Sequence, residues 1–288
     1  MISWLLALGS AVFLGFYDLT KKASLRDNAV LPVLFLCSLS SAVLLSPALL
    51  SPDVLNISLR THLMLLGKAF IVTASWVFTF HALSHLPLSI AAPIRASAPL
   101  FTILLAVSFM GERPSGVQWF GIILLFLSYY TFSVAGKKET GSFWNNRWVI
   151  FMFIGTLLGA LSGIYDKFLI QSAWISPTVV QVWFSVYLTL LQGVILGFWT
   201  LFAKQKKTKF KFRWIILLVG GFLVIADRLY FMALNEPGAL ISTVSVIRRT
   251  NVIVSFCGGI FLWKEKLIPV KLLAFTGIMT GLIIIGLG

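Results

Sequence analysis

The sequence predicts an all-α membrane protein of ten transmembrane helices, arranged as two inverted five-helix repeats. Composition, the length of the apolar runs and an internal duplication support this fold class. Of the 288 residues, 59% are hydrophobic and 11% are charged, whereas charged residues make up about a quarter of a typical soluble domain. The apolar runs are long and continuous, and about 20 such residues cross a bilayer as one helix. A transmembrane β-barrel would instead show short segments of alternating polarity.

The ten expected helices follow one another with short connectors. Their apolar runs cover residues 2–22, 30–50, 63–84, 88–109, 116–135, 148–170, 178–202, 213–234, 239–262 and 267–287. Prolines such as Pro87, Pro177 and Pro237 mark turns or helix starts, because proline lacks the N–H that a helix interior needs. The connectors 84–87 and 235–238 are so short that we expect the helices they join to be antiparallel neighbours.

Four short segments recur in the same order in the two halves of the chain, which indicates an internal duplication. The matching pairs are Gly15-Phe16-Tyr17-Asp18 with Gly163-Ile164-Tyr165-Asp166, Ala82-Leu83 with Ala233-Leu234, Ile94-Arg95 with Ile247-Arg248, and Gly111-Glu112-Arg113 with Lys264-Glu265-Lys266. Each copy contains five helices, an odd number, so the second copy enters the membrane from the opposite side. Such inverted repeats are common in secondary transporters. We therefore divide the chain into a first repeat at 1–135, a linker at 136–147 and a second repeat at 148–288.

These residues resemble the drug/metabolite transporter superfamily, in its ten-helix EamA-type branch, and the resemblance covers essentially the whole chain. Apart from the repeats, it rests on Gly15 and Lys21 in the first helix, Ala82-Leu83 before the fourth, Pro99 within it and Gly111-Glu112-Arg113 before the fifth. The second repeat departs from the pattern, because Lys264-Glu265-Lys266 lacks the glycine. The resemblance implies a central cavity between the repeats, lined by the first, third, fourth, sixth, eighth and ninth helices.

Lys and Arg residues are distributed unevenly between the two sides of the expected bundle. Fourteen lie in the connectors of one side, whereas the other side has Arg60, Arg113 and Lys167. Because positive connectors tend to stay in the cytoplasm, we expect a multi-pass protein of the bacterial cytoplasmic membrane, with cytoplasmic basic loops and both termini outside. The family resemblance alone implies both termini inside, and we follow the charges. The basic stretch 204–213 is expected to contact anionic lipid and not nucleic acid.

Ionisable residues within the apolar runs are the candidate site, because a charge in hydrocarbon costs at least about 2.5 kcal/mol and usually faces a cavity or a partner. The candidates are Asp18, Arg95, Asp166, Asp227, Arg228, Arg248 and Arg249, with Tyr17, Tyr165 and Tyr230 as aromatic lining. Their expected role is substrate binding or gating, and the alternative is a set of buried ion pairs that only hold helices together. The repeat predicts two equivalent contacts, Asp18–Arg95 and Asp166–Arg248, which form and break as two gates alternate.

These features favour a secondary transporter that moves a small polar metabolite by alternating access through the central cavity. The intramembrane arginines favour an anionic or zwitterionic substrate, because arginine forms bidentate contacts with carboxylate and phosphate. The sequence has no nucleotide-binding motif, so we expect coupling to a proton or ion gradient or to exchange. The alternative is a broad-specificity exporter of amphipathic compounds or a lipid-linked-sugar flippase, and an intramembrane enzyme is disfavoured. His81 and His85 lie one turn apart but lack a third ligand, so we expect no metal, cofactor or catalytic residue.

Overall fold

The computed structural model is helical throughout its described regular structure. It describes residues 2–98, 100–102, 104–105, 115–117, 119–124, 127–128, 131, 145–202, 209–237, 239, 241–263 and 269–287. Several residues used above lie outside these ranges: Pro99, Gly111-Glu112-Arg113, Lys264-Glu265-Lys266 and most of the linker at 136–147.

The helices of the first half begin close to the residues that the apolar runs predict. They are α1 (Ile2–Leu25), α2 (Val30–Leu45), the 3-10 helix η1 (Ser46–Leu50), α3 (Pro52–Leu55), α4 (Leu59–His85) and α5 (Leu88–Ala96). The α-helical part of the second run ends at Leu45, and the chain tightens into η1, which has a proline in its first turn. Helix α4 begins a turn earlier than expected, because the Ser58 hydroxyl accepts a hydrogen bond from the Thr61 N–H and caps it.

The helices of the second half follow the same plan. They are α8 (Arg147–Lys167), continued by the π-helical η2 (Phe168–Ser172), then α9 (Pro177–Phe202), α10 (Ile215–Asn235), α11 (Ile241–Arg248), α12 (Asn251–Trp263) and α13 (Pro269–Leu287). Asn146 caps α8 by accepting the Trp148 N–H at 2.9 Å. The expected ninth helix is broken at Arg249 and Thr250, so it forms the two segments α11 and α12.

Six of the described spans are long and apolar enough to cross a membrane. They are Ile2–Leu25, Val30–Leu50, Leu59–His85, Arg147–Ser172, Pro177–Phe202 and Ile215–Asn235. The predicted class, an all-helical integral membrane protein, is therefore confirmed. The count of ten helices and the inverted repeat stay predictions, since part of the expected fourth, fifth, ninth and tenth helices lies outside the described residues.

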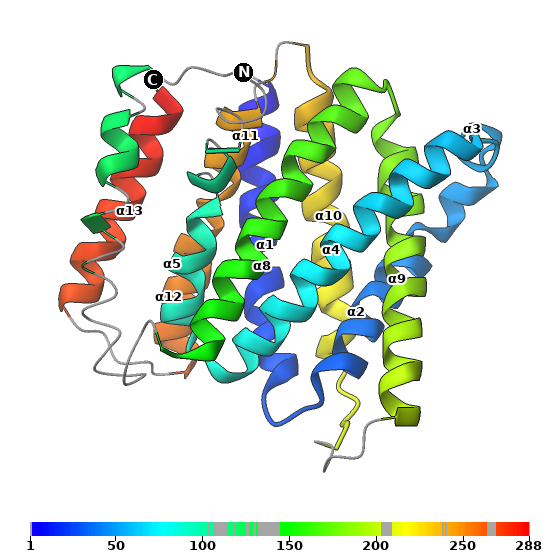
Figure 1. Ribbon diagram of the computed structural model, residues 1–288, viewed down its shortest axis with the longest axis horizontal. Helices are drawn as coiled ribbons and strands as arrows, with labels where there is room; N and C mark the ends of the chain where they lie inside the picture. Colours follow the sequence, from blue (N-terminus) through cyan, green and yellow to red (C-terminus); the bar gives the residue numbers. More distant parts are fainter. Residues whose placement is uncertain are drawn as a thin grey trace.

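Helix α1 lies near the middle of the bundle and packs along α10, while α4 packs along α8 (Figure 1). Helix α2 contacts α9 and α10, and α5 contacts α12. In Figure 1, α1 runs from the top of the view to the bottom, and α8 runs from the bottom to the top. The beginning of α1 and the end of α13 lie at the same end of the bundle.

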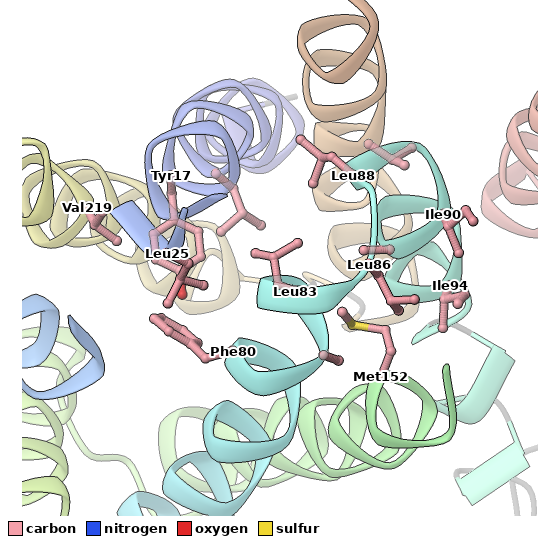
Figure 2. Packing of buried hydrophobic residues seen from close by; sticks show 14 of the residues in the cluster. Tyr17, Leu25, Phe80, Leu83, Leu86, Leu88, Ile90, Ile94, Met152 and Val219 are labelled. Carbon is pink, nitrogen blue, oxygen red and sulfur yellow. The ribbon is translucent and has the colours of Figure 1, made fainter. Parts of the chain in front are cut away.

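A large apolar cluster joins the two halves at the other end of the bundle, where α1 ends and α8 and α10 begin. Its members come from helices of both halves and include Phe80, Leu83, Leu86, Leu88, Met152 and Val219 (Figure 2). Phe80, Met152 and Val219 are fully buried. Basic residues lie where α1 ends (Lys22 and Arg26), where α8 begins (Arg147) and just before α10 (Lys209 and Arg213), and we call this end of the bundle the basic end.

Candidate functional site

A cavity of about 150 Å³ lies between α1, α4, α5, α8, α10 and α11. Small and polar residues on α8, including Gly155, Gly159, Ser162 and Asp166, follow one another at helical spacing and form one face of it. Gly155 belongs to the contact with α4, because the Ser75 hydroxyl donates to its carbonyl oxygen at 2.7 Å. The cavity is therefore built on a close helix crossing, and charged side chains enter it from several helices.

Asp18 is the most highly connected charged residue of the site. Its Oδ1 atom pairs with the Arg95 guanidinium of α5 and lies 3.4 Å from Lys21 Nζ. Its Oδ2 atom accepts hydrogen bonds from Asn251 Nδ2 at 2.8 Å and from Ser255 Oγ at 3.1 Å. Asp18 is 1% exposed. The contact predicted between Asp18 and Arg95 is present, and this carboxylate also holds α12 against α1.

The contact predicted between Asp166 and Arg248 is wrong. Asp166 pairs with Lys68 of α4 through its Oδ1 atom, and its Oδ2 atom accepts the Tyr230 hydroxyl at 3.4 Å. The reason is that Asp166 lies on the face of α8 that packs against α4, as Gly155 does three turns earlier.

Arg248 instead pairs with Asp227 of α10. Its Nε atom donates to Ser10 Oγ of α1 at 3.2 Å, and its guanidinium lies 4.1 Å from the centre of the Tyr230 ring. Arg248 ends α11, which contacts both α10 and α1, so Asp227 is the nearer carboxylate. Tyr17 and Tyr230 both line the cavity, as proposed for them.

Lys21 and Lys68 are cavity residues that the sequence candidates did not include. Lys21 Nζ lies 4.3 Å and 4.9 Å from the ring centres of Tyr17 and Phe80, and Lys68 Nζ lies 4.5 Å from the centre of Phe184. Such ring faces stabilise an ammonium group. Lys68 meets the same criterion as the other candidates, because it lies within the expected third helix at 63–84, but it was not among them.

Three of the remaining candidates have different surroundings. Arg249 lines the cavity, and its Nε atom is buried without a hydrogen-bond partner among the described residues. Arg228 is exposed on α10 and donates to Thr178 Oγ1 at 2.8 Å, away from the cavity lining. The Tyr165 hydroxyl donates to the Met64 carbonyl oxygen at 3.3 Å, and its side chain is not part of the described lining.

The described charges of the site are positive in sum. Five cations line the cavity (Lys21, Lys68, Arg95, Arg248 and Arg249). Against them stand three carboxylates, Asp166 and Asp227 in the lining and Asp18, which pairs with Lys21 and Arg95. Long apolar helices around a small charged cavity are typical of integral membrane proteins of the transporter class.

Comparison with known proteins supports this class. Residues 1–134 match the EamA-like transporter family. This match, which covers just under half of the chain, confirms the resemblance to the EamA-type branch of the drug/metabolite transporter superfamily.

Two further similarities extend the comparison. The uncharacterized transporter YwfM of Bacillus subtilis (strain 168) is 31% identical over 140 residues, which are 47% of this chain and 46% of that protein. The match thus spans about half the length of this relative. A solved crystal structure shares the fold over 97% of this chain and 95% of its own, with a TM-score of 0.70 and 14% identity. The family match and the name of this relative support a membrane transporter, whereas the solved structure supports the fold alone.

Proposed function

We propose that the protein is a secondary transporter that moves a small anionic or zwitterionic metabolite by alternating access through the cavity between two inverted five-helix repeats. The observation that carries the proposal is the buried array of ion pairs around the cavity, which involves Asp18, Asp166 and Asp227. Charges at this depth are expensive in a membrane and usually belong to a substrate or ion pathway. A proton, an ion or an exchanged solute would drive transport.

The packing of the helices supports the repeats at 1–135 and 148–288. If α1 corresponds to α8 and α4 corresponds to α10, the contact of α1 with α10 and the contact of α4 with α8 are two copies of one interface. The contacts of α2 with α10 and of α9 with α4 are related in the same way. Corresponding helices run in opposite directions, as α1 and α8 do in Figure 1. This is the relation that an inverted repeat requires.

Helix breaks at matching places support a pair of gates. Helix α5 ends one residue after Arg95, and α11 ends at Arg248, so each arginine lies at the end of a short helix within the bundle. Broken helices of this kind form the substrate sites of many secondary transporters. We therefore assign the two gating contacts to Asp18–Arg95 and to Asp227–Arg248, each within one half of the chain.

The size of the cavity favours a small polar substrate over the alternative substrates. An engineered protein cavity of about 150 Å³ holds a molecule of the size of benzene. An amphipathic drug or a lipid-linked sugar is much larger, and its apolar part would have to lie against the buried charges. The charge bias of the connectors favours the bacterial cytoplasmic membrane, with the basic end in the cytoplasm.

Uptake by purified protein in liposomes tests the proposed function. We expect radiolabelled small carboxylates or amino acids to enter, with uptake saturating and depending on an imposed proton or ion gradient or on internal solute. Asp18→Asn and Asp227→Asn should each reduce uptake strongly, because each removes a gating contact. Equal flux in empty and protein-containing liposomes for the whole panel would reject transport of this substrate class.

A further inference from the structure

Arg249 differs from the other cations of the cavity because it has no ionic partner among the described residues. Lys21 and Arg95 share Asp18, Lys68 pairs with Asp166, and Arg248 pairs with Asp227. For Arg249 the structure gives neither an ion pair nor a hydrogen bond within the described part of the chain, and its Nε atom is fully buried. Arg249 as a whole is half-buried, and no described partner offsets the cost of partly burying its charge. The residue is therefore a candidate for binding something that is not part of the chain.

The position of Arg249 suits an anion receptor. It lies at the break between α11 and α12, next to the gating residue Arg248, and its side chain lines the cavity. A guanidinium presents planar, paired N–H donors that match the two oxygens of a carboxylate or the oxygens of a phosphate.

Two carboxylates line the cavity, Asp166 and Asp227, and a third, Asp18, pairs with two of its lining cations. All three are already bound by donors of the protein, and this limits which groups the other end of the substrate can carry. Asp18 receives four donors, Asp166 receives Lys68 and Tyr230, and Asp227 receives Arg248. Within the described lining, no carboxylate is left without a cation. The ammonium group of an amino acid would therefore have to break an existing ion pair to find an acceptor.

We infer that Arg249 binds the oxyanion group of the substrate, and that the substrate is a small anion without a cationic group. This inference rests on the proposed function and narrows it in two respects. It specifies an anionic and not a zwitterionic substrate, and it identifies Arg249 among the candidate residues as the one that binds the oxyanion. From the cavity volume, the ligand has about six to ten non-hydrogen atoms. A carboxylate and a phosphate offer the same chemistry to the guanidinium, and the probes below separate them.

The first test needs no ligand. Thermal unfolding of the purified protein is compared among Arg249→Gln, Arg248→Gln and Arg228→Gln. We expect Arg249→Gln to raise the unfolding temperature, because it removes a half-buried charge that has no ionic partner in the described chain. Arg248→Gln should lower it, because Asp227 loses its cation. Arg228→Gln, which changes an exposed arginine outside the cavity lining, should leave it nearly unchanged. A fall for Arg249→Gln as large as that for Arg248→Gln would overturn the inference, since Arg249 would then be structurally paired.

The second test compares ligands of matched size on wild type and on Arg249→Gln. The probes are lactate and alanine, 4-methylpentanoate and leucine, benzoate, and inorganic phosphate, with binding measured by calorimetry in detergent. Wild type should bind the anion of each pair more tightly than the zwitterion. Arg249→Gln should weaken anion binding by about 10- to 100-fold, since hydrogen bonds to charged groups contribute that much. Arg249→Lys should weaken anion binding less, because lysine keeps the positive charge although it lacks the paired N–H donors of the guanidinium.

The outcomes separate this inference from the proposed function. Three results would each overturn the inference, even if liposomes showed uptake. The first is tighter binding of alanine or leucine than of lactate or 4-methylpentanoate. The others are equal anion binding by wild type and Arg249→Gln, and no anion binding by wild type. Anion binding that depends on Arg249 without any uptake would keep the inference and reject transport. Preference for phosphate over all carboxylates would identify the phosphate as the oxyanion.

Discussion

The charged residues of the cavity are buried as pairs, so the effect of a substitution depends on what happens to the partner. The side chains of Lys68 and Asp166 are 3% and 7% exposed. Removing one member of a buried ion pair destabilises a protein by about 3–5 kcal/mol, whereas replacing both members by uncharged residues is often neutral.

Lys68→Met and Asp166→Asn should therefore be strongly non-additive. We expect each single variant to lower the unfolding temperature clearly, and the double variant to be closer to wild type than the sum of the two changes. A double-mutant cycle on thermal unfolding in detergent measures this coupling. Additive effects would mean that the two side chains do not interact in the folded protein.

Asp18 and Asp227 allow a second comparison at the same scale. Asp18→Asn leaves two cations, Lys21 and Arg95, without a carboxylate, whereas Asp227→Asn leaves only Arg248. We expect Asp18→Asn to lower the unfolding temperature more than Asp227→Asn does. The two variants are compared under identical detergent and salt, and a larger loss for Asp227→Asn would contradict the shared role of Asp18.

The sequence located most charged residues of the cavity but not their pairing. Charge within an apolar run is a local signal, and it found Asp18, Arg95, Asp227 and Arg248. Pairing is a tertiary property, since it depends on which face of one helix meets another. The proposed repeat makes Asp166 and Arg248 the counterparts of Asp18 and Arg95, yet Asp166 pairs with Lys68. The periodicity of a single helix does not predict such a contact between helices.

At the scale of the helix, the crossing of α4 and α8 depends on the absence of a side chain at Gly155. A Cβ atom there would lie 2.9 Å from the Ser75 carbonyl oxygen and 3.2 Å from the Thr79 amide nitrogen, and both are backbone atoms. Gly197 in α9 is a suitable control, because a Cβ atom there would meet nothing within 4 Å.

Gly155→Ala should therefore destabilise the protein, while Gly197→Ala should be neutral or stabilising by up to about 1 kcal/mol, the helix propensity gain of alanine over glycine. The unfolding temperatures of the two variants check this. If Gly155→Ala were as stable as Gly197→Ala, the crossing would have to be looser than the structure shows.

Helix extents were predicted to within about a turn at most ends, because long apolar runs report directly on membrane-spanning segments. The breaks after Arg95 and Arg248 were not predicted. Pro99 follows the end of α5 by three residues, a common signal of a helix end, whereas no glycine or proline lies at the end of α11 at Arg248. These breaks coincide with the ion pairs to Asp18 and Asp227, which are tertiary contacts.

At the scale of the whole molecule, the charges at the basic end predict the orientation in the membrane. We predict that a membrane-impermeant maleimide added to intact bacterial cells labels Asn56→Cys and fails to label Lys209→Cys, in a background with Cys37→Ser and Cys257→Ser. Both positions are exposed, and they lie at opposite ends of the bundle (Figure 1). Labelling after membrane permeabilisation serves as the control, and the reverse pattern would place both termini in the cytoplasm.

The excess of cations over carboxylates around the cavity has an electrical consequence. Moving one elementary charge through the full membrane field changes its energy by about 2.3 kcal/mol per 100 mV. An empty carrier whose binding site is positive would therefore respond to the resting voltage of a bacterium, whereas a carrier neutralised by its anion would respond less. The voltage would then act mainly on the return step of the cycle, and it would hold the vacant site facing the negative side of the membrane.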